Sequence, residues 1–280
     1  DKLTAGSRSA QGGLSLPLTR CGSVGWLALI GSGLFFVLTL LQYGCVLLSG
    51  FLKSKKGVYS FTLDHWNELW SIGASPVVRS VAYALIVAVV GTLFAALFAY
   101  YMDRRRVPGR AFFDCIATMP YMLPGTCFGI GYILAFNHAP FKLTGTAIIV
   151  LANMLFKQLP TSAKICSATL AQLQPAQERS AQDLGAGRLA VIRDVVLPNM
   201  RPALLSCFVY NFTSSMTTAG AIIFLIDPSR QLAVFRLFDA VYRGDYALAS
   251  VRASVITAIV LAVEGLVWLL SRKEGKRRVS

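Results

Sequence analysis

Six apolar stretches follow one another along the chain, with short polar segments between them. A helix needs roughly 20 apolar residues to cross about 30 Å of hydrocarbon, and each stretch reaches or approaches that length. The pattern therefore predicts an all-α, polytopic membrane protein with six transmembrane helices in one domain. The predicted spans are residues 24–48, 77–102, 112–137, 146–170, 202–226 and 252–270, and the short tails are residues 1–23 and 272–280.

Two of these stretches contain helix-breaking or charged residues. Pro120 and Pro124 interrupt the third, and Lys157 and Pro160 lie in the fourth. Prolines are tolerated inside a membrane where neighbouring helices satisfy the freed carbonyl groups, and small residues let helix backbones approach closely. Two interpretations stay open, a lining of a transport path or ordinary helix packing. The candidates for either are Pro120, Pro124, Gly125, Gly129, Lys157 and Pro160.

Charge composition supports the membrane assignment. Only 14% of the 280 residues are charged, against roughly 25% in soluble domains, because charge near the bilayer centre is costly. The net charge of +14 sits in short runs between apolar stretches, which is typical of charge that sets membrane topology. It does not form the basic face of a nucleic-acid-binding protein, so we expect no nucleic-acid partner.

The basic residues also predict the orientation. Inside segments of membrane proteins carry an excess of Lys and Arg, and most basic residues fall on one side if both termini are cytoplasmic. That side holds Lys2, Arg8, Arg20, Arg104, Arg105, Arg106, Arg110, Arg179, Arg188, Arg193, Arg201, Arg272, Lys273, Lys276, Arg277 and Arg278. The other side holds Lys53, Lys55, Lys56, Lys142, Arg230, Arg236 and Arg243. The cluster at 53–56 runs against the rule.

Neither an enzyme site nor a metal site is indicated. The six cysteines are widely spaced, without a Cys-x-x-Cys pair or a Cys/His cluster, so no disulfide framework or zinc site is predicted. His65 and His138 have no evident ligand partners. Around His65, the aromatic spacing in residues 57–75 predicts a short amphipathic helix at the membrane interface.

The longest inside segment, residues 174–198, has the pattern of two short helices. Pro175 fits the first turn of a helix, and Glu178 lies near its positively polarised end. Gly185 and Gly187 are expected to end that helix. A second helix is predicted with Leu189, Ile192 and Val196 on one face, ending at Leu197-Pro198.

The spacing in this segment resembles the EAA loop of binding-protein-dependent ABC importer permeases, the MetI-like family. Nine residues separate Gly185 from Val195-Val196-Leu197-Pro198, and Ala181 also fits. Arg179 and Ser180 depart from the motif, and Glu178 lies one position early. The resemblance covers about residues 60–271, with a permease core at about 75–271. Segments 105–110, 119–125, 129–137 and 216–225 are similar to the ferric-iron type, in particular to the second half of fused iron permeases. A start at Asp1 rather than Met fits such a half.

This resemblance implies a function and a set of partners. Residues 174–198, called the coupling loop below, would bind a dimeric ABC ATPase through Glu178, Ala181, Leu184, Gly185, Val195, Leu197 and Pro198. ATP and Mg would be held by that ATPase, and no cofactor by this chain, which has no Gly-x-x-x-x-Gly-Lys-Ser/Thr loop. The other implied partners are an external solute-binding protein, a second permease half or a second copy, and the lipid of a bacterial inner membrane.

The substrate implied by the resemblance is ferric iron, and sulfate, polyamine or phosphonate permeases share the same architecture. A secondary transporter is the alternative from another class, since such proteins also have kinked helices with ionisable residues near the membrane midplane. Lys157, Lys164 and Glu264 would be its candidates. Association with an ATPase and ATP-dependent uptake would distinguish the two classes.

Overall fold

The computed structural model describes residues 22–55, 58–71, 74–105, 107–138, 140 and 142–277. Most of the predicted N-terminal tail, Arg106 and the last three residues lie outside these ranges. The chain divides into two compact units, residues 1–45 and residues 46–280, and each is described by itself.

The first unit contains most of α1, Ser23–Ser49. Apolar side chains lie on every face of this helix, and large ones such as Trp26, Phe35 and Leu41 are more than half exposed. A helix that is apolar on all faces belongs in a protein core or in lipid. The predicted first span is therefore confirmed as a helix long and apolar enough to cross a membrane.

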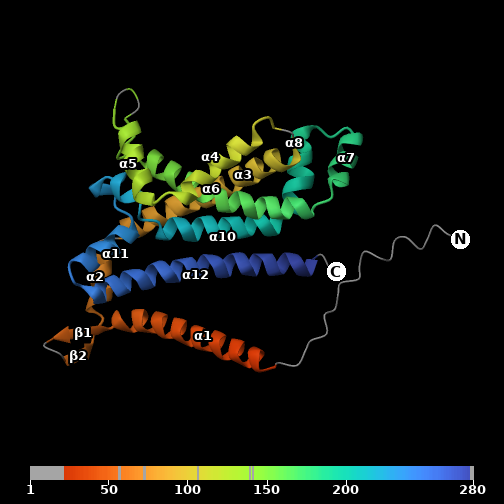
Figure 1. Ribbon diagram of the computed structural model, residues 1–280. Helices are drawn as coiled ribbons and strands as arrows, with labels where there is room; N and C mark the ends of the chain where they lie inside the picture. The colour runs from red at the N-terminus through yellow and green to blue at the C-terminus, as the bar shows by residue number, and fades with distance from the viewer. Residues whose placement is uncertain are drawn as a thin grey trace. The chain divides into compact units, whose positions relative to one another are not determined.

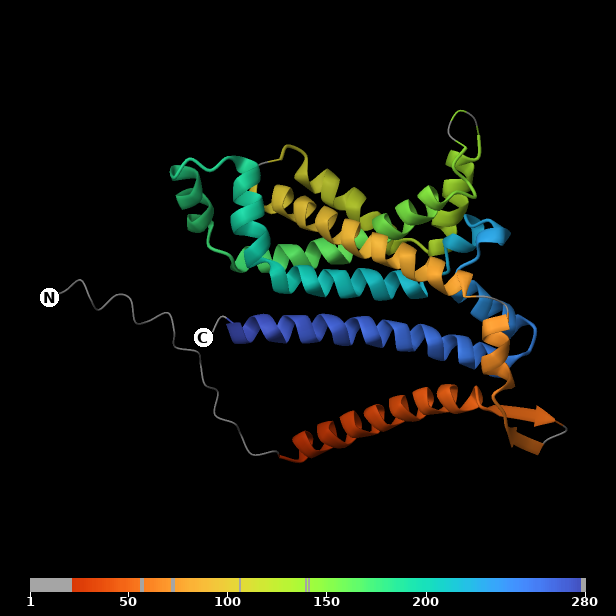
Figure 2. The ribbon, with the colours of Figure 1, turned by 180° about the vertical axis from the view of Figure 1, so that it is seen from behind.

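In the second unit, the last residues of α1 are followed by a hairpin and then by helices (Figure 1 and Figure 2). Strands β1 (Leu52–Lys55) and β2 (Val58–Phe61) pair antiparallel, with Leu52 opposite Phe61. This hairpin was not predicted, and the expected interfacial helix is the shorter α2, Asp64–Ser71. The main helices are α3 (Ser75–Arg104), α4 (Arg110–Met122), α5 (Gly125–Phe136), α6 (Ala147–Gln172), α10 (Arg201–Thr217), α11 (Ala233–Tyr242) and α12 (Tyr246–Arg277). Short 3-10 turns, η2 (Ile222–Phe224) and η3 (Pro228–Arg230), connect α10 to α11.

Helices α3, α6 and α10 form the centre of this unit, and Figure 1 shows them side by side. Small residues on α3 allow the close approach, because a Cβ on Gly91 would lie 3.2 Å from Nδ2 of Asn211 on α10. Asn211 is buried and links all three helices. Its Oδ1 accepts a hydrogen bond from Ser162 on α6 (2.7 Å), and its Nδ2 donates to Thr92 on α3 (3.2 Å). Where lipid weakens the hydrophobic driving force, such contacts hold helices together.

The predicted third span is two helices rather than one. Helices α4 and α5 meet at an angle of 112°, because Leu123 is extended (φ −93°, ψ 143°) and the residue before a proline is pushed out of the helical region. Pro120 lies inside α4 and Pro124 precedes α5. The sequence predicted an interruption at these prolines, and the break lies at Leu123, directly before Pro124.

The six-span count is not confirmed by length and composition. Among the described residues, α1, α3 and α12 are long and apolar enough to cross a membrane, and the bent α4–α5 pair adds a fourth if it is one span. Helix α6 matches the predicted fourth span in position. The predicted fifth span ends early, at Thr217, because Thr218 is extended and the chain continues into η2.

Gly129 provides a test of the α5–η2 contact. A Cβ at this position would lie 2.6 Å from the backbone oxygen of Ala221, which cannot move without displacing η2. We expect Gly129→Ala to lower the free energy of unfolding by about 1–3 kcal/mol through overpacking. Thermal unfolding in lipid nanodiscs measures this change.

Gly131 is the matched control, because it lies on the same helix and has no atom within 4 Å of an added Cβ. Gly131→Ala should leave stability unchanged or raise it, since Ala favours helix. Equal destabilisation by the two substitutions would contradict the packing described here.

Candidate coupling site

The coupling loop begins with α7, Pro175–Asp183, and turns sharply at Gly185. Gly185 has φ +88°, and nothing lies within 4 Å of an added Cβ. Glycine is therefore needed at this position for its backbone conformation and not because of crowding. The turn closes by hydrogen bonds from the Gly185 N–H to the Gln182 oxygen (2.9 Å) and from the Ala186 N–H to the Ala181 oxygen (3.0 Å). The predicted start at Pro175 and the glycine break are both confirmed.

The second helix of the loop has three consecutive parts, α8 (Arg188–Ala190), the π-helical turn η1 (Val191–Val196) and α9 (Leu197–Asn199). Two details differ from the prediction. The helix continues through Pro198 to Asn199, and Leu189 lies on the exposed side, 78% exposed. The π-helical turn has more residues per turn than an α-helix. It therefore shifts the inward face to Val191, Ile192 and Val196.

This inward face packs on the ends of the central helices. Val191, Ile192 and Val196 form one buried cluster with Ala96, Ala99 and Tyr100 of α3, Cys166 and Leu170 of α6, and Met200 and Cys207 next to and on α10. Ala181, Ala186, Val195 and Leu197 pack against its edge. The loop is thus part of the helix bundle's core, and a force applied to it would reach three helices.

An ion pair fastens the first helix of the loop. Arg104, the last residue of α3, lies 3.1 Å from a Glu178 carboxylate oxygen, and both side chains are mostly buried. Arg104 also donates to the backbone oxygens of Leu170 (2.7 Å) and Leu173 (2.6 Å) at the end of α6. The Tyr100 hydroxyl donates to the other Glu178 oxygen (3.2 Å). Glu178 therefore joins α7 to α3, and Arg104 joins α3 to α6.

Two large apolar side chains of the loop point away from this core. Leu184, directly before Gly185, is 89% exposed, and Leu189 follows just after the turn. Two large exposed apolar side chains on either side of the Gly185 turn are candidates for a contact surface. Figure 1 shows α7 and α8 together at one end of the second unit.

The second group of predicted residues is only partly brought together. Pro120, Gly125 and Lys157 line a small cavity of about 10 Å³ with Asn153, Tyr132, Phe128, Phe156 and Ala221. This volume suits one water molecule. The Nδ2 atom of Asn153 is buried without a hydrogen-bond partner in the described structure. Gly129 packs on Ala221 and Phe224, and Pro160 is buried within α6, so both have packing roles.

Several residues of the coupling site were not predicted. Arg104 was named only among the inside basic residues, and Tyr100 only fell within the second span, although both contact Glu178. The regular α-helical period predicted Leu189, Ile192 and Val196 on one face and left Val191 out.

Residues 88–273 match the family of binding-protein-dependent transport system inner membrane components. The chain belongs to this family. The permease fold is confirmed by a crystal structure of a bacterial alginate ABC transporter in complex with an alginate pentasaccharide-bound periplasmic protein. A chain of that structure superposes with a TM-score of 0.70 at 17% identity, over 89% of this chain and 94% of its own length.

Relatives of this permease transport different solutes, as their names state. Ferric transport system permease protein FbpB of Actinobacillus pleuropneumoniae is 30% identical over 236 residues, covering 82% of this chain and 34% of that protein. Sulfate transport system permease protein CysT of Salmonella typhimurium is 30% identical over 268 residues, covering 89% of this chain and 94% of that protein. This permease therefore spans about a third of the length of its ferric relatives.

The Glu178–Arg104 pair can be tested against an exposed pair of the same loop. Glu178→Gln keeps an acceptor for Tyr100 but removes the charge beside Arg104. We expect hydrogen-exchange protection of the α7 amides to fall about ten- to a hundredfold, because a mostly buried pair is worth more than a surface pair.

The control is Asp194→Asn, which removes an exposed pair with Arg193 (3.7 Å) and should leave exchange of the loop unchanged. If Glu178→Gln left the protection of α7 at the level of the unmodified protein, the ion pair would not fasten the loop.

Proposed function

We propose that this permease is the translocating subunit of an ATP-driven importer and that its coupling loop is the binding surface of a separate ATPase. One observation carries the proposal: the loop exposes Leu184 and Leu189 while Val191, Ile192 and Val196 anchor it in the bundle core. A surface that receives a mechanical force must be exposed to the partner and stiffly attached to the part that moves. The coupling loop meets both requirements.

The path of the force follows from the contacts. Motion of the ATPase would press on the turn around Gly185 and displace α7 and η1 together. The ion pair at Glu178 passes this displacement to α3, and the η1 side chains pass it to α3, α6 and α10. Because packed helices shift between discrete arrangements rather than deform continuously, the bundle would change between two states that expose the path to opposite sides.

This proposal gives the membrane orientation. The ATPase subunit of such an importer is cytoplasmic. The coupling loop would therefore lie on the cytoplasmic side of a bacterial inner membrane. The C-terminal end of α12 lies at the same end of the second unit as the coupling loop (Figure 1), which agrees with a cytoplasmic C-terminus and with its basic residues. We expect the N-terminus on the same side from its Lys and Arg content.

Two further partners complete the proposed importer. A solute-binding protein would deliver substrate on the outer side, as the periplasmic protein named in the alginate structure suggests. A second permease half, or a second copy, would complete the transport path. A groove of about 1110 Å³ between α10 and α12, with Leu205, Val209, Leu261 and Trp268 among its lining residues, offers such a half an apolar surface. ATP and Mg would be bound by the ATPase.

Docking of the ATPase is tested by changing the exposed leucine. Leu184→Asp would bury a charge in the interface without disturbing the core, because Leu184 is 89% exposed. We expect at least about tenfold weaker binding of the ATPase to the permease in nanodiscs, with loss of ATP-dependent uptake and normal membrane insertion.

The matched control is Tyr242→Asp, an equally exposed apolar-to-acid change on α11, at the other end of the second unit (Figure 1). Its ATPase binding should equal that of the unmodified protein. Full ATPase binding by Leu184→Asp would mean that the partner docks elsewhere.

We propose ferric iron as the substrate, and the supporting observation is the 30% identity to ferric permeases. Sulfate is the second candidate, because the sulfate permease matches over 94% of its length. Vesicles that contain the complete importer should take up radiolabelled ferric iron with ATP, and sulfate should not compete. Uptake of sulfate alone would overturn the iron assignment and leave the coupling proposal intact.

A further inference from the structure

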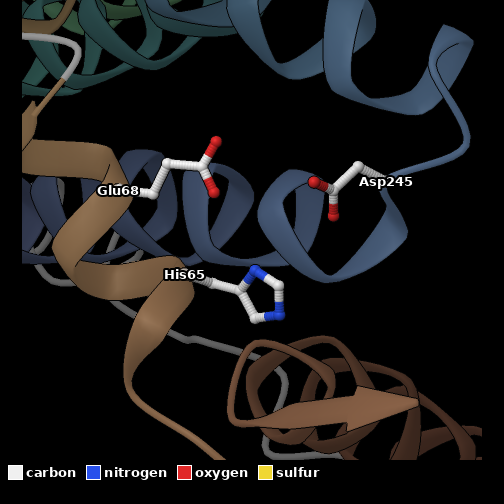
Figure 3. A group of neighbouring side chains, drawn as sticks. All are labelled: His65, Glu68 and Asp245. Carbon is white, nitrogen blue, oxygen red and sulfur yellow. The ribbon is translucent and has the colours of Figure 1, made fainter. Parts of the chain in front are cut away.

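A group of three side chains with metal-binding atoms lies where α2 meets the start of α12. His65 and Glu68 stand three residues apart on α2, and Asp245 directly precedes α12. Their nitrogen and oxygen atoms all lie within 4.8 Å of one another. Figure 3 shows the imidazole and both carboxylates directed into the same space. The prediction of no ligand set around His65 missed this group, because Asp245 is far away in the sequence.

Helix α2 and the start of α12 position these side chains. Residues three apart on a helix share a face, so α2 presents His65 and Glu68 together toward α12, on which α2 packs. Asp245 caps α12, since its Oδ1 accepts a hydrogen bond from the Leu248 N–H (3.0 Å). Its backbone N–H donates to the Ala240 oxygen (3.0 Å). The cap uses one carboxylate oxygen of Asp245 and leaves the second for a ligand.

His65 supplies the observation that calls for a ligand. Both of its ring nitrogens are buried, and neither has a hydrogen-bond partner in the described structure. A buried polar atom without a partner is costly, and native structures rarely leave two on one ring. A cation held between the imidazole and the carboxylates would satisfy one nitrogen and offset the negative charge of the two acids.

Two basic side chains near the group also make contacts elsewhere. Arg243 pairs with Asp239 (3.0 Å), and the Arg252 guanidinium donates to the backbone oxygen of Arg236. The positive charge that faces the group from α12 is Arg252, which interacts electrostatically with Glu68 and Asp245. Its guanidinium has no lone pair for a metal and serves as a fixed charge at the edge of the site.

We propose that His65, Glu68 and Asp245 bind a divalent transition-metal ion of the zinc type. An imidazole with two carboxylates suits Zn²⁺ and its first-row neighbours, whereas Mg²⁺ and Ca²⁺ prefer oxygen ligands alone. Tetrahedral bonds of about 2.1 Å place ligand atoms about 3.4 Å apart, and side-chain rotation of Glu68, which is exposed, closes the set to that size. Three protein ligands leave a coordination position for water or for a group from a partner.

The position of this site gives it a structural role. Helix α3 runs from the α2 end of the second unit to Arg104 at the coupling loop, and its 30 residues span about 45 Å. The metal would join α2 to α12 at the end opposite the coupling loop. If the coupling loop is cytoplasmic, as proposed above, the site lies on the outer side. The metal site itself does not depend on that proposal.

The test is a titration of the full-length protein in nanodiscs with Co²⁺, whose visible absorption reports the number and kind of ligands, followed by displacement with Zn²⁺. We expect one site that Mg²⁺ and Ca²⁺ do not fill, and a Zn²⁺-dependent rise in Tm of a few degrees. His65→Ala should weaken binding at least about a hundredfold and Asp245→Asn at least about tenfold, since even outer partners of a metal site are worth 10- to 100-fold.

The chain offers good controls for this experiment. It has two histidines, and His138→Ala should leave the Co²⁺ spectrum unchanged. Asp245→Asn keeps an oxygen that can cap α12, so it separates metal binding from folding. If the unmodified protein and His65→Ala gave the same Co²⁺ spectrum and the same Tm with Zn²⁺, His65 would not be a metal ligand, and the proposal would be wrong. ATP-dependent uptake is measured separately and tests only the proposed function.

Discussion

The burial of Val191, Ile192 and Val196 beneath the coupling loop is the interaction on which the rest of the structure depends. These side chains occupy the space between the ends of α3, α6 and α10, so the loop cannot move without the three helices. Burial of such side chains is worth about 1.5–3 kcal/mol each, which is enough to keep a loop of this length attached. The Glu178–Arg104 pair is a second point of attachment, because it joins α7 to the end of α3.

The central bundle of α3, α6 and α10 is held by contacts suited to lipid. Asn211 links α3, α6 and α10 through hydrogen bonds to Thr92 and Ser162, and small residues on α3 let the backbones approach. Each such hydrogen bond in a membrane is worth only about 0.6 kcal/mol. Weak polar contacts and close packing permit two arrangements of similar energy, which a transport cycle requires.

Local features of the sequence predicted much of this fold. Uniformly apolar runs predicted α1, α3 and α12, and Pro175 and Gly185 predicted the bounds of α7, because these signals act on their own residues. Features that depend on tertiary structure were missed. Arg104 meets Glu178 from another helix, and Leu189, which was expected on the inward face, lies on the exposed side because of the π-helical turn. His65 and Asp245 meet only because α2 packs on α12.

The most direct test of the central claim measures whether the coupling loop moves with the bundle. Spin labels at Arg193, an exposed residue of the coupling loop, and at Tyr101, an exposed residue of α3, report the distance between the loop and the bundle by pulsed electron paramagnetic resonance in the assembled importer. The account predicts one narrow distance distribution that stays the same with and without ATP, because the loop and α3 form one rigid body. A broad distribution, or one that shifts with nucleotide, would show a loop that flexes on the bundle and would contradict it.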